Sequence, residues 1–153
     1  MPVIATGPYH WAIATDKRGL STPEVFRQLD QQRAAASEAS PKAARAGSPE
    51  GLIAALRTGN PEEVGKLLVN DLQAPAISLL PSLRETLKAA EEAGAIAAIV
   101  SGSGPTVAML CASADDAVEV ATAVSVAGKA SSTMTTSSPA AAAGVIKREE
   151  VLE

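Results

Sequence analysis

Residues 95–111 read AIAAIVSGSGPTVAMLC, and this stretch decides the fold. Its first part, Ala95 to Val100, is a continuous run of small apolar residues, which is typical of a buried strand. A glycine-rich turn follows at Ser101–Pro105, and Thr106 to Cys111 form a second apolar run. Two such runs joined by a short turn predict a pair of neighbouring strands.

Helix and strand signals continue on both sides of this pair. Ser113 can cap a helix that ends at Gly128, and residues 132–138 alternate weakly, as an edge strand does. Upstream, residues 11–14 form a short apolar strand, and further helices are predicted to begin at Ser21–Glu24, Ser48–Glu50, Asn60–Glu63 and Pro81. This order predicts an α+β fold, a two-layer sandwich whose helices cover one face of a mostly antiparallel sheet.

Length and composition bound the possible functions. The 153 residues suit one domain over 1–153, in which 37–48 is predicted to be a flexible surface loop because it lacks periodicity. The net charge of −4 and the absence of a basic block argue against nucleic acid and anionic membranes as partners. One Cys and one His exclude a disulfide framework and a Cys/His zinc cage, so no metal site is predicted. No targeting or membrane-spanning pattern is visible, which predicts a soluble, cytoplasmic protein.

The turn at 101–106 is the sharpest chemical feature. Gly102 and Gly104 allow positive φ angles and a close approach of another group. Successive amide groups in such a turn can bind an anion, with the hydroxyl groups of Ser101, Ser103 and Thr106 as further donors. From spacing alone, a plain tight turn is the favoured interpretation. A dinucleotide fingerprint is excluded because no third glycine follows and a strand, not a helix, comes next.

Other candidates have simpler explanations. Gly59–Lys66 superficially looks like a phosphate-binding P-loop, but its spacing is too long and Leu67 stands where Ser or Thr is needed. His10 is predicted to be structural, Cys111 to be a packed thiol, and Asp115 with Asp116 to be capping charges. Phe26 stays open between a core position and a ring that stacks on a flat ligand.

Beyond these local patterns, the segment Ser101–Val107 resembles the third, C-terminal motif of the GHMP kinases. Three more segments, His10–Trp11, Leu20–Phe26 and Asn70–Gln73, resemble in order one branch of that superfamily. That branch transfers the γ-phosphate of ATP, with magnesium, to the 2-hydroxyl of 4-diphosphocytidyl-2-C-methyl-D-erythritol in non-mevalonate isoprenoid biosynthesis. The resemblance implies a ferredoxin-like C-terminal domain with extra helices.

The resemblance also implies roles for particular residues. Phe26 matches an aromatic position that stacks on cytosine, and Thr22 matches a neighbouring substrate-side position. The residues that match the loop beside the phosphate-binding loop are Ser101, Gly102, Ser103, Gly104 and Thr106. The family's N-terminal ATP-binding half, with its phosphate loop and catalytic Asp, has no counterpart here. No catalytic residue is therefore expected in this chain, which is predicted to bind no cofactor and to be inactive without that half.

Two other interpretations remain. One is a stand-alone ferredoxin-like binding or regulatory module whose Gly-Ser turn holds a small anion. The other is half of a different GHMP kinase, such as a homoserine or mevalonate kinase, although the Ser-Thr-Pro-Glu-Val-Phe segment argues against it.

Overall fold

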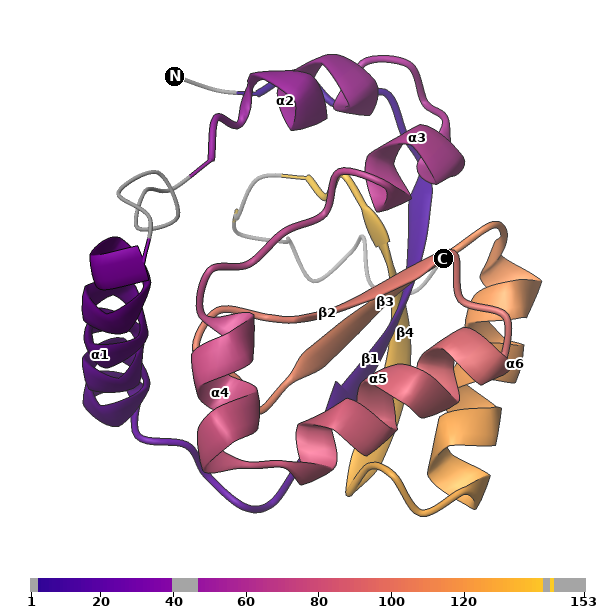
Figure 1. Ribbon diagram of the computed structural model, residues 1–153. Helices are drawn as coiled ribbons and strands as arrows, with labels where there is room; N and C mark the ends of the chain where they lie inside the picture. Colours follow the sequence, from indigo (N-terminus) through magenta and orange to yellow (C-terminus); the bar gives the residue numbers. More distant parts are fainter. Residues whose placement is uncertain (1–2, 40–46, 142–143, 145–153) are drawn as a thin grey trace.

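The computed structural model describes residues 3–39, 47–141 and 144. Its elements are β1 (Tyr9–Thr15), α1 (Thr22–Ala39), α2 (Glu50–Leu56), α3 (Pro61–Gly65), α4 (Gln73–Leu79), α5 (Ser82–Glu92), β2 (Ala97–Val100), β3 (Val107–Cys111), α6 (Ala114–Val126) and β4 (Ser132–Ser138). In Figure 1, α6 lies to the right of the strands, α5 in front of them, α4 and then α1 to the left, and α2 and α3 above.

The strands form one antiparallel sheet in the order β2-β3-β1-β4. β1 is therefore a central strand, paired with β3 through Ala12↔Met109 and with β4 through Ala12↔Thr135. The predicted α+β sandwich with an antiparallel sheet is confirmed. The weakly alternating segment at 132–138 forms the edge strand β4.

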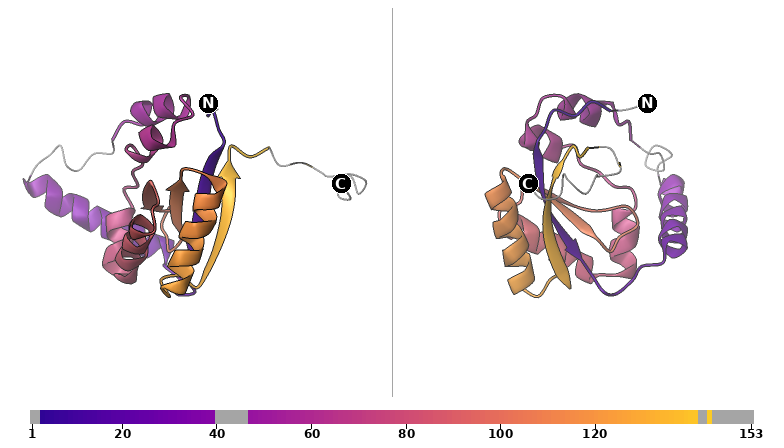
Figure 2. Two further views of the ribbon diagram at one scale, coloured as in Figure 1. Left: turned by 90° about the vertical axis from the view of Figure 1, so that its right-hand side faces the viewer. Right: turned by 180° about the vertical axis from the view of Figure 1, so that it is seen from behind.

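The larger apolar core lies between one face of the sheet and the helices. Ala12, Met109 and Val107 are buried on this face, and α5 and α6 contribute Leu83 and Val120. The left view of Figure 2 shows α6 in front of β1 and β4. Small side chains such as Ala12 let the helices approach the sheet closely, which explains how an alanine-rich chain builds this layer.

A smaller cluster lies on the other face, at one end of the sheet. Here α2 and α3 pack on Tyr9 and Leu110 through Ala55 and Val64. The phenol of Tyr9 donates a hydrogen bond to the carbonyl of Leu56 at 2.8 Å, which fixes the end of α2. The starts of both short helices were predicted from the sequence. The expectation that helices cover one face of the sheet alone is wrong at this end, because α2 and α3 pack on the opposite face.

Two local expectations need correction. Helix α1 runs to Ala39, so its last residues enter the segment predicted as a flexible loop, while 40–46 lie outside the described residues. Helix α4 was not predicted at all. It begins without a side-chain cap and contains Pro75 in its first turn, where the missing amide costs nothing.

None of the helices in the described ranges is long and apolar enough to cross a membrane.

Candidate functional site

The turn between β2 and β3 is held by its own backbone. Ser101 N donates to Thr106 O at 2.8 Å, and Gly104 N donates to Ser101 O at 3.0 Å. Gly102 and Gly104 have φ angles of +57° and +75°, so both glycines are used for positive φ as predicted. The amides of Ser101 and Gly104 are thus engaged inside the turn, which reduces the anion-binding donors that the sequence suggested.

Gly104 is also a packing position. A Cβ atom there would lie 3.1 Å from Val100 Cγ1 and 3.3 Å from Leu20 Cδ1. The backbone of the turn therefore lies directly against the side chain of Leu20, two residues before α1 begins. This contact joins the turn to the segment that carries Thr22.

Thr22, the first residue of α1, reaches the turn. Its Oγ1 lies 2.9 Å from Ser103 Oγ, which brings together two positions that the sequence predicts to be functional. Phe26 is one helical turn further along the same face of α1. Its side chain is 49% exposed, whereas its neighbours Val25 and Leu29 are buried. Phe26 is thus not a core residue, and its side chain is accessible to solvent.

The side chain of Asn70 holds the turn through hydrogen bonds to its backbone carbonyl groups. Its amide nitrogen donates to Val100 O at 2.7 Å and to Gly102 O at 2.8 Å, and its oxygen accepts from Leu72 N at 3.0 Å. Gln73 completes the support because its side-chain oxygen accepts from Val100 N at 2.9 Å. The residue pattern alone did not assign this role. Its only signal was a polar segment, 70–73, interrupting an apolar stretch.

A groove of about 430 Å³ borders this support. Its lining residues are Gly47, Ser48, Pro49, Gly51, Leu52, Leu67, Val69, Asn70 and Asp71. Leu67 and Val69 are 43% and 74% exposed, which gives the groove an apolar floor beside the polar Asn70. Asp71 pairs with Arg33 of α1 at 2.9 Å. The groove, the turn and α1 are therefore neighbours, and together they form the candidate site.

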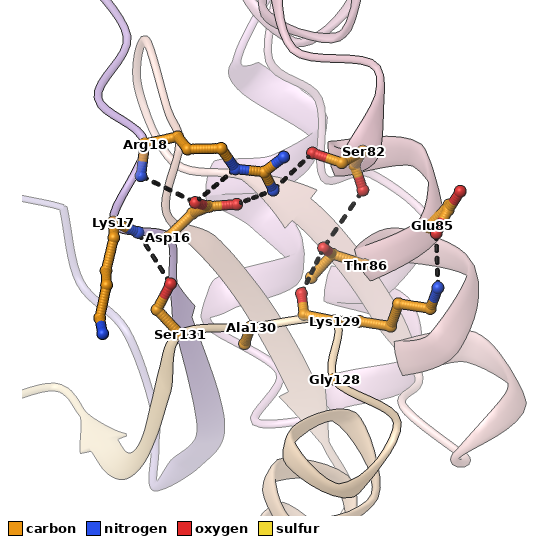
Figure 3. Close-up of a pocket in the computed structure, with 10 residues that line it drawn as sticks. All are labelled: Asp16, Lys17, Arg18, Ser82, Glu85, Thr86, Gly128, Lys129, Ala130 and Ser131. Atoms are coloured by element: carbon orange, nitrogen blue, oxygen red, sulfur yellow. Dashed lines mark hydrogen bonds and ion pairs between the residues drawn. The ribbon is translucent and has the colours of Figure 1, made fainter.

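A second cleft, of about 340 Å³, lies where the β1–α1 loop meets α5 and the α6–β4 loop (Figure 3). Its polar groups bind one another: Arg18 donates to Asp16 and, at 2.9 Å, to Ser82 Oγ. The hydrogen bonds from Arg18 hold the pKa of the Asp16 carboxyl below its ordinary value. Lys129 pairs with Glu85 and holds the pKa of that carboxyl low in the same way. Hydrogen bonds and an ion pair in this cleft therefore connect the β1–α1 loop, α5 and the α6–β4 loop.

The remaining candidates are structural. Ser113 caps α6 by accepting from Asp116 N at 3.0 Å, as predicted. Cys111 is buried, and burial raises the pKa of its thiol. Gly65 packs against the start of β2. A Cβ added to it would lie 2.8 Å from Ile96 Cγ2, just before the strand, and 3.3 Å from Ala97 Cβ, so this glycine belongs to a helix–sheet contact. Within the described ranges, no three His, Cys, Asp or Glu residues gather as a metal site would require.

Comparisons with known proteins show the family to which the chain is related. The family described as "GHMP kinases C terminal" matches residues 52–130. A 4-diphosphocytidyl-2-C-methyl-D-erythritol kinase of Corynebacterium jeikeium (strain K411) is 98% identical over 153 residues, which are all of this chain and 43% of that protein. The kinase of the same name in Nocardia farcinica (strain IFM 10152) is 49% identical over 149 residues, 97% of this chain and 47% of that protein. The chain thus spans less than half the length of these curated relatives.

A solved structure shows the same fold. The crystal structure of a 4-(cytidine 5'-diphospho)-2C-methyl-D-erythritol kinase superposes with a TM-score of 0.64 and 22% sequence identity, covering 88% of this chain and 44% of that one. At this identity the likeness concerns the fold alone.

Proposed function

The chain belongs to the GHMP kinase family, and on that premise we propose that it is the substrate-side part of a kinase that phosphorylates 4-diphosphocytidyl-2-C-methyl-D-erythritol. The kinase would transfer the γ-phosphate of ATP to the 2-hydroxyl group of this substrate. The 98% identity to a kinase of that name supports this choice over a homoserine or mevalonate kinase and over a stand-alone module.

The hydrogen bond between Thr22 and Ser103 is the observation that carries the proposal. It places the helix that bears Phe26 next to the turn that resembles the third GHMP motif. The ring of Phe26, 49% exposed, is available to stack on the cytosine base, and Thr22 lies between that ring and the turn. The cytidine end of the substrate would then lie along α1, and its reacting end near residues 101–106.

We assign the rest of the chemistry to the part of the kinase that precedes this chain in its relatives. Phosphoryl transfer depends on positioning the γ-phosphate and neutralising its charge, usually with a phosphate loop and magnesium. We assign no magnesium ligand to this chain, because the described residues contain no cluster of His, Cys, Asp or Glu side chains that could hold a metal ion. The turn at 101–106 would border the phosphates and position the reacting groups. It would neither accept the proton of the substrate hydroxyl group nor bind magnesium. We also propose that the reaction takes place in the cytoplasm, because ATP is the phosphoryl donor of the kinase.

An ATP-dependent phosphorylation assay tests this function. The whole kinase of Corynebacterium jeikeium, with 43% of its length matched by this chain, should phosphorylate the cytidine-linked substrate, while the 153-residue chain alone should show no turnover. Turnover by the chain alone at the rate of the whole kinase would contradict the assignment of catalysis to the other part. Preference of the whole kinase for homoserine or mevalonate would contradict the proposed substrate.

A further inference from the structure

Helix α1 is well packed at its beginning and weakly packed beyond Leu29. Val25 and Leu29 are buried. Residues 30–38 follow on the same helix, and none of their side chains is buried. The left view of Figure 2 shows this end of α1 extending away from the sheet. The direction of α1 therefore depends on the contacts that residues 30–38 make.

Two side-chain hydrogen bonds join residues 30–38 to other elements of the described chain. Gln32 Nε2 donates to Ser78 Oγ of α4 at 3.1 Å. Arg33 Nη2 donates to Asp71 Oδ2 at 2.9 Å. The second bond joins a guanidinium group to a carboxylate, and such charge-assisted bonds are stronger than neutral ones. The ion pair of Arg33 and Asp71 is therefore the stronger of the two contacts.

Asp71 lies inside a short closed turn that also holds the candidate site. Asn70 Oδ1 accepts a hydrogen bond from Leu72 N at 3.0 Å, and Asn70 O accepts one from Gln73 N at 3.0 Å. Because Asp71 stands between these bonded residues, its backbone is fixed relative to Asn70. The side chain of Asn70 donates to two carbonyl groups at the β2–β3 turn. One short segment thus holds that turn through Asn70 and α1 through Asp71.

The ring of Phe26 lies between two contacts that hold α1. At the start of the helix, Thr22 Oγ1 lies 2.9 Å from Ser103 Oγ. Arg33 holds the helix 11 residues later, about 16 Å along its axis. Phe26 and Arg33 share one side of α1, because seven residues make nearly two helical turns. A change in the direction of α1 would therefore move the Phe26 ring relative to the turn at 101–106.

We propose that Arg33 and Asp71 are positioning residues for the substrate, because their ion pair holds the Phe26 ring at a fixed place beside the turn at 101–106. This role rests on the proposed function, which places the cytosine base on Phe26. The side chains of Arg33 and Asp71 are 35% and 42% exposed, and ion pairs this exposed contribute little to overall stability. The effect of the pair should therefore appear in substrate binding and not in unfolding.

Steady-state kinetics of the whole Corynebacterium jeikeium kinase test the proposal. Asp71→Asn and Arg33→Gln, at the equivalent positions, should each raise KM for the cytidine-linked substrate about three- to fivefold. The value of kcat and the KM for ATP should stay unchanged. Because both variants break the same contact, the double variant should show no larger rise than either single variant. Arg33→Lys keeps a cation at this position, and its KM should stay within about twofold of wild type.

Glu92→Gln is the matched control for the loss of an exposed ion pair. Glu92 pairs with Lys88 at 3.6 Å on α5, a helix that contributes no residue to the candidate site. Its substitution should change neither KM value.

Hydrogen exchange of the same kinase variants reports on α1 directly. The amides of residues 31–38 should exchange about two- to fivefold faster in Asp71→Asn and Arg33→Gln than in wild type. The amides of α6 should keep their rates in all variants, and Glu92→Gln should leave the exchange of residues 31–38 unchanged.

Three results would overturn the proposal. The first is an unchanged KM in both variants, or a rise confined to one of them, because the two residues would then not act as a pair. The second is a rise in the double variant equal to the product of the two single rises, which would show that the residues act separately. The third is an equal loss in kcat, in KM for ATP and in the free energy of unfolding, which would identify a general structural role.

The same proteins separate this proposal from the proposed function. A wild-type kinase that phosphorylates the substrate, together with variants that keep its KM, contradicts the positioning role alone. A wild-type kinase that does not phosphorylate the substrate contradicts the function. Faster exchange of residues 31–38 in both variants of that kinase would still support the role of the ion pair in holding α1.

Discussion

Thr22 Oγ1 lies 2.9 Å from Ser103 Oγ, although 81 residues separate them in the sequence. The contact joins the start of α1 to the turn between β2 and β3. It therefore fixes how Phe26, on the same helix, is placed relative to that turn.

A double-mutant cycle measures this contact. Thr22→Val and Ser103→Ala should each lower the free energy of unfolding by about 0.5–1 kcal/mol, and the double variant should lose little more than one single variant. Urea denaturation of the chain gives the four values. Thr22→Ser keeps the hydroxyl and should stay close to wild type. Fully additive losses would show that the two hydroxyls do not interact.

Substitution by alanine should destabilise the protein to different extents at the two glycines of the turn. Both have positive φ, which costs a residue with a Cβ about 1–2 kcal/mol. Gly104→Ala should lower the free energy of unfolding by about 1–3 kcal/mol more than Gly102→Ala. The reason is that the Cβ at position 104 would lie 3.1 Å from Val100 and 3.3 Å from Leu20. Nothing lies within 4 Å of a Cβ at Gly102, which makes Gly102→Ala the matched control. Equal unfolding free energies for the two variants would contradict the packing role of Gly104.

The sequence predicts those elements whose signals are local. The caps at Asn60 and Ser113 each bond an amide two or three residues away, so pattern alone finds α3 and α6. Helix α4 has no such cap, and its buried residues Pro75 and Ala76 owe their order to packing. A seven-residue helix held by tertiary contacts leaves no local signal, which explains why it was missed.

The candidate site shows the same limit more sharply. The residues that resemble the family motifs identify Thr22, Phe26 and the turn one by one. Their pairing, and the two bonds from Asn70 to carbonyl oxygens about 30 residues away, depend on the fold as a whole. Spacing in the sequence does not reveal such contacts. The exposure of Phe26, which excludes a core position and leaves its contact with a ligand as a prediction, likewise depends on the packing of its helix.

Asn70 and Gln73 allow a matched test of the support beneath the turn. Asn70→Asp replaces a donor that serves Val100 O and Gly102 O by a carboxylate, and should lower the free energy of unfolding by about 2–3 kcal/mol. Gln73→Glu keeps the acceptor for Val100 N and should cost less than about 1 kcal/mol. Both are measured by urea denaturation at pH 7. Similar losses for the two variants would contradict the donor role of Asn70.

The stability of the chain should depend on pH through Asp16. Hydrogen bonds from Arg18 lower the pKa of Asp16 in the folded state, below the value of about 3.9 in unfolded chains. A lowered folded pKa means that the carboxylate stabilises the fold above the unfolded pKa, and that this contribution is lost as the pH falls through the folded pKa. Asp16→Asn should therefore be less stable than wild type at pH 7, and the difference should close in acid.

Urea denaturation of both proteins between about pH 2 and pH 7 measures this difference. Arg18→Met removes the partner and should lose the same pH-dependent contribution. A difference between wild type and Asp16→Asn that stays constant across this range would contradict the role of the ion pair.

Phe26 separates ligand binding from folding. In the whole kinase, Phe26→Ala should weaken binding of the cytidine-linked substrate by about 1–3 kcal/mol, the range known for base stacking on aromatic side chains, or about 5- to 150-fold. Isothermal titration measures this loss. Phe26→Tyr keeps an aromatic ring and should bind the substrate nearly as well as wild type. Phe26→Leu keeps the apolar bulk without a ring and should bind the substrate more weakly than wild type.

Because the Phe26 side chain is 49% exposed, Phe26→Ala should change the unfolding free energy little. Val25→Ala, at a fully buried neighbour, should instead cost about 2 kcal/mol of stability with little effect on binding. Unchanged affinity combined with a large loss of stability in Phe26→Ala would assign Phe26 to the core after all.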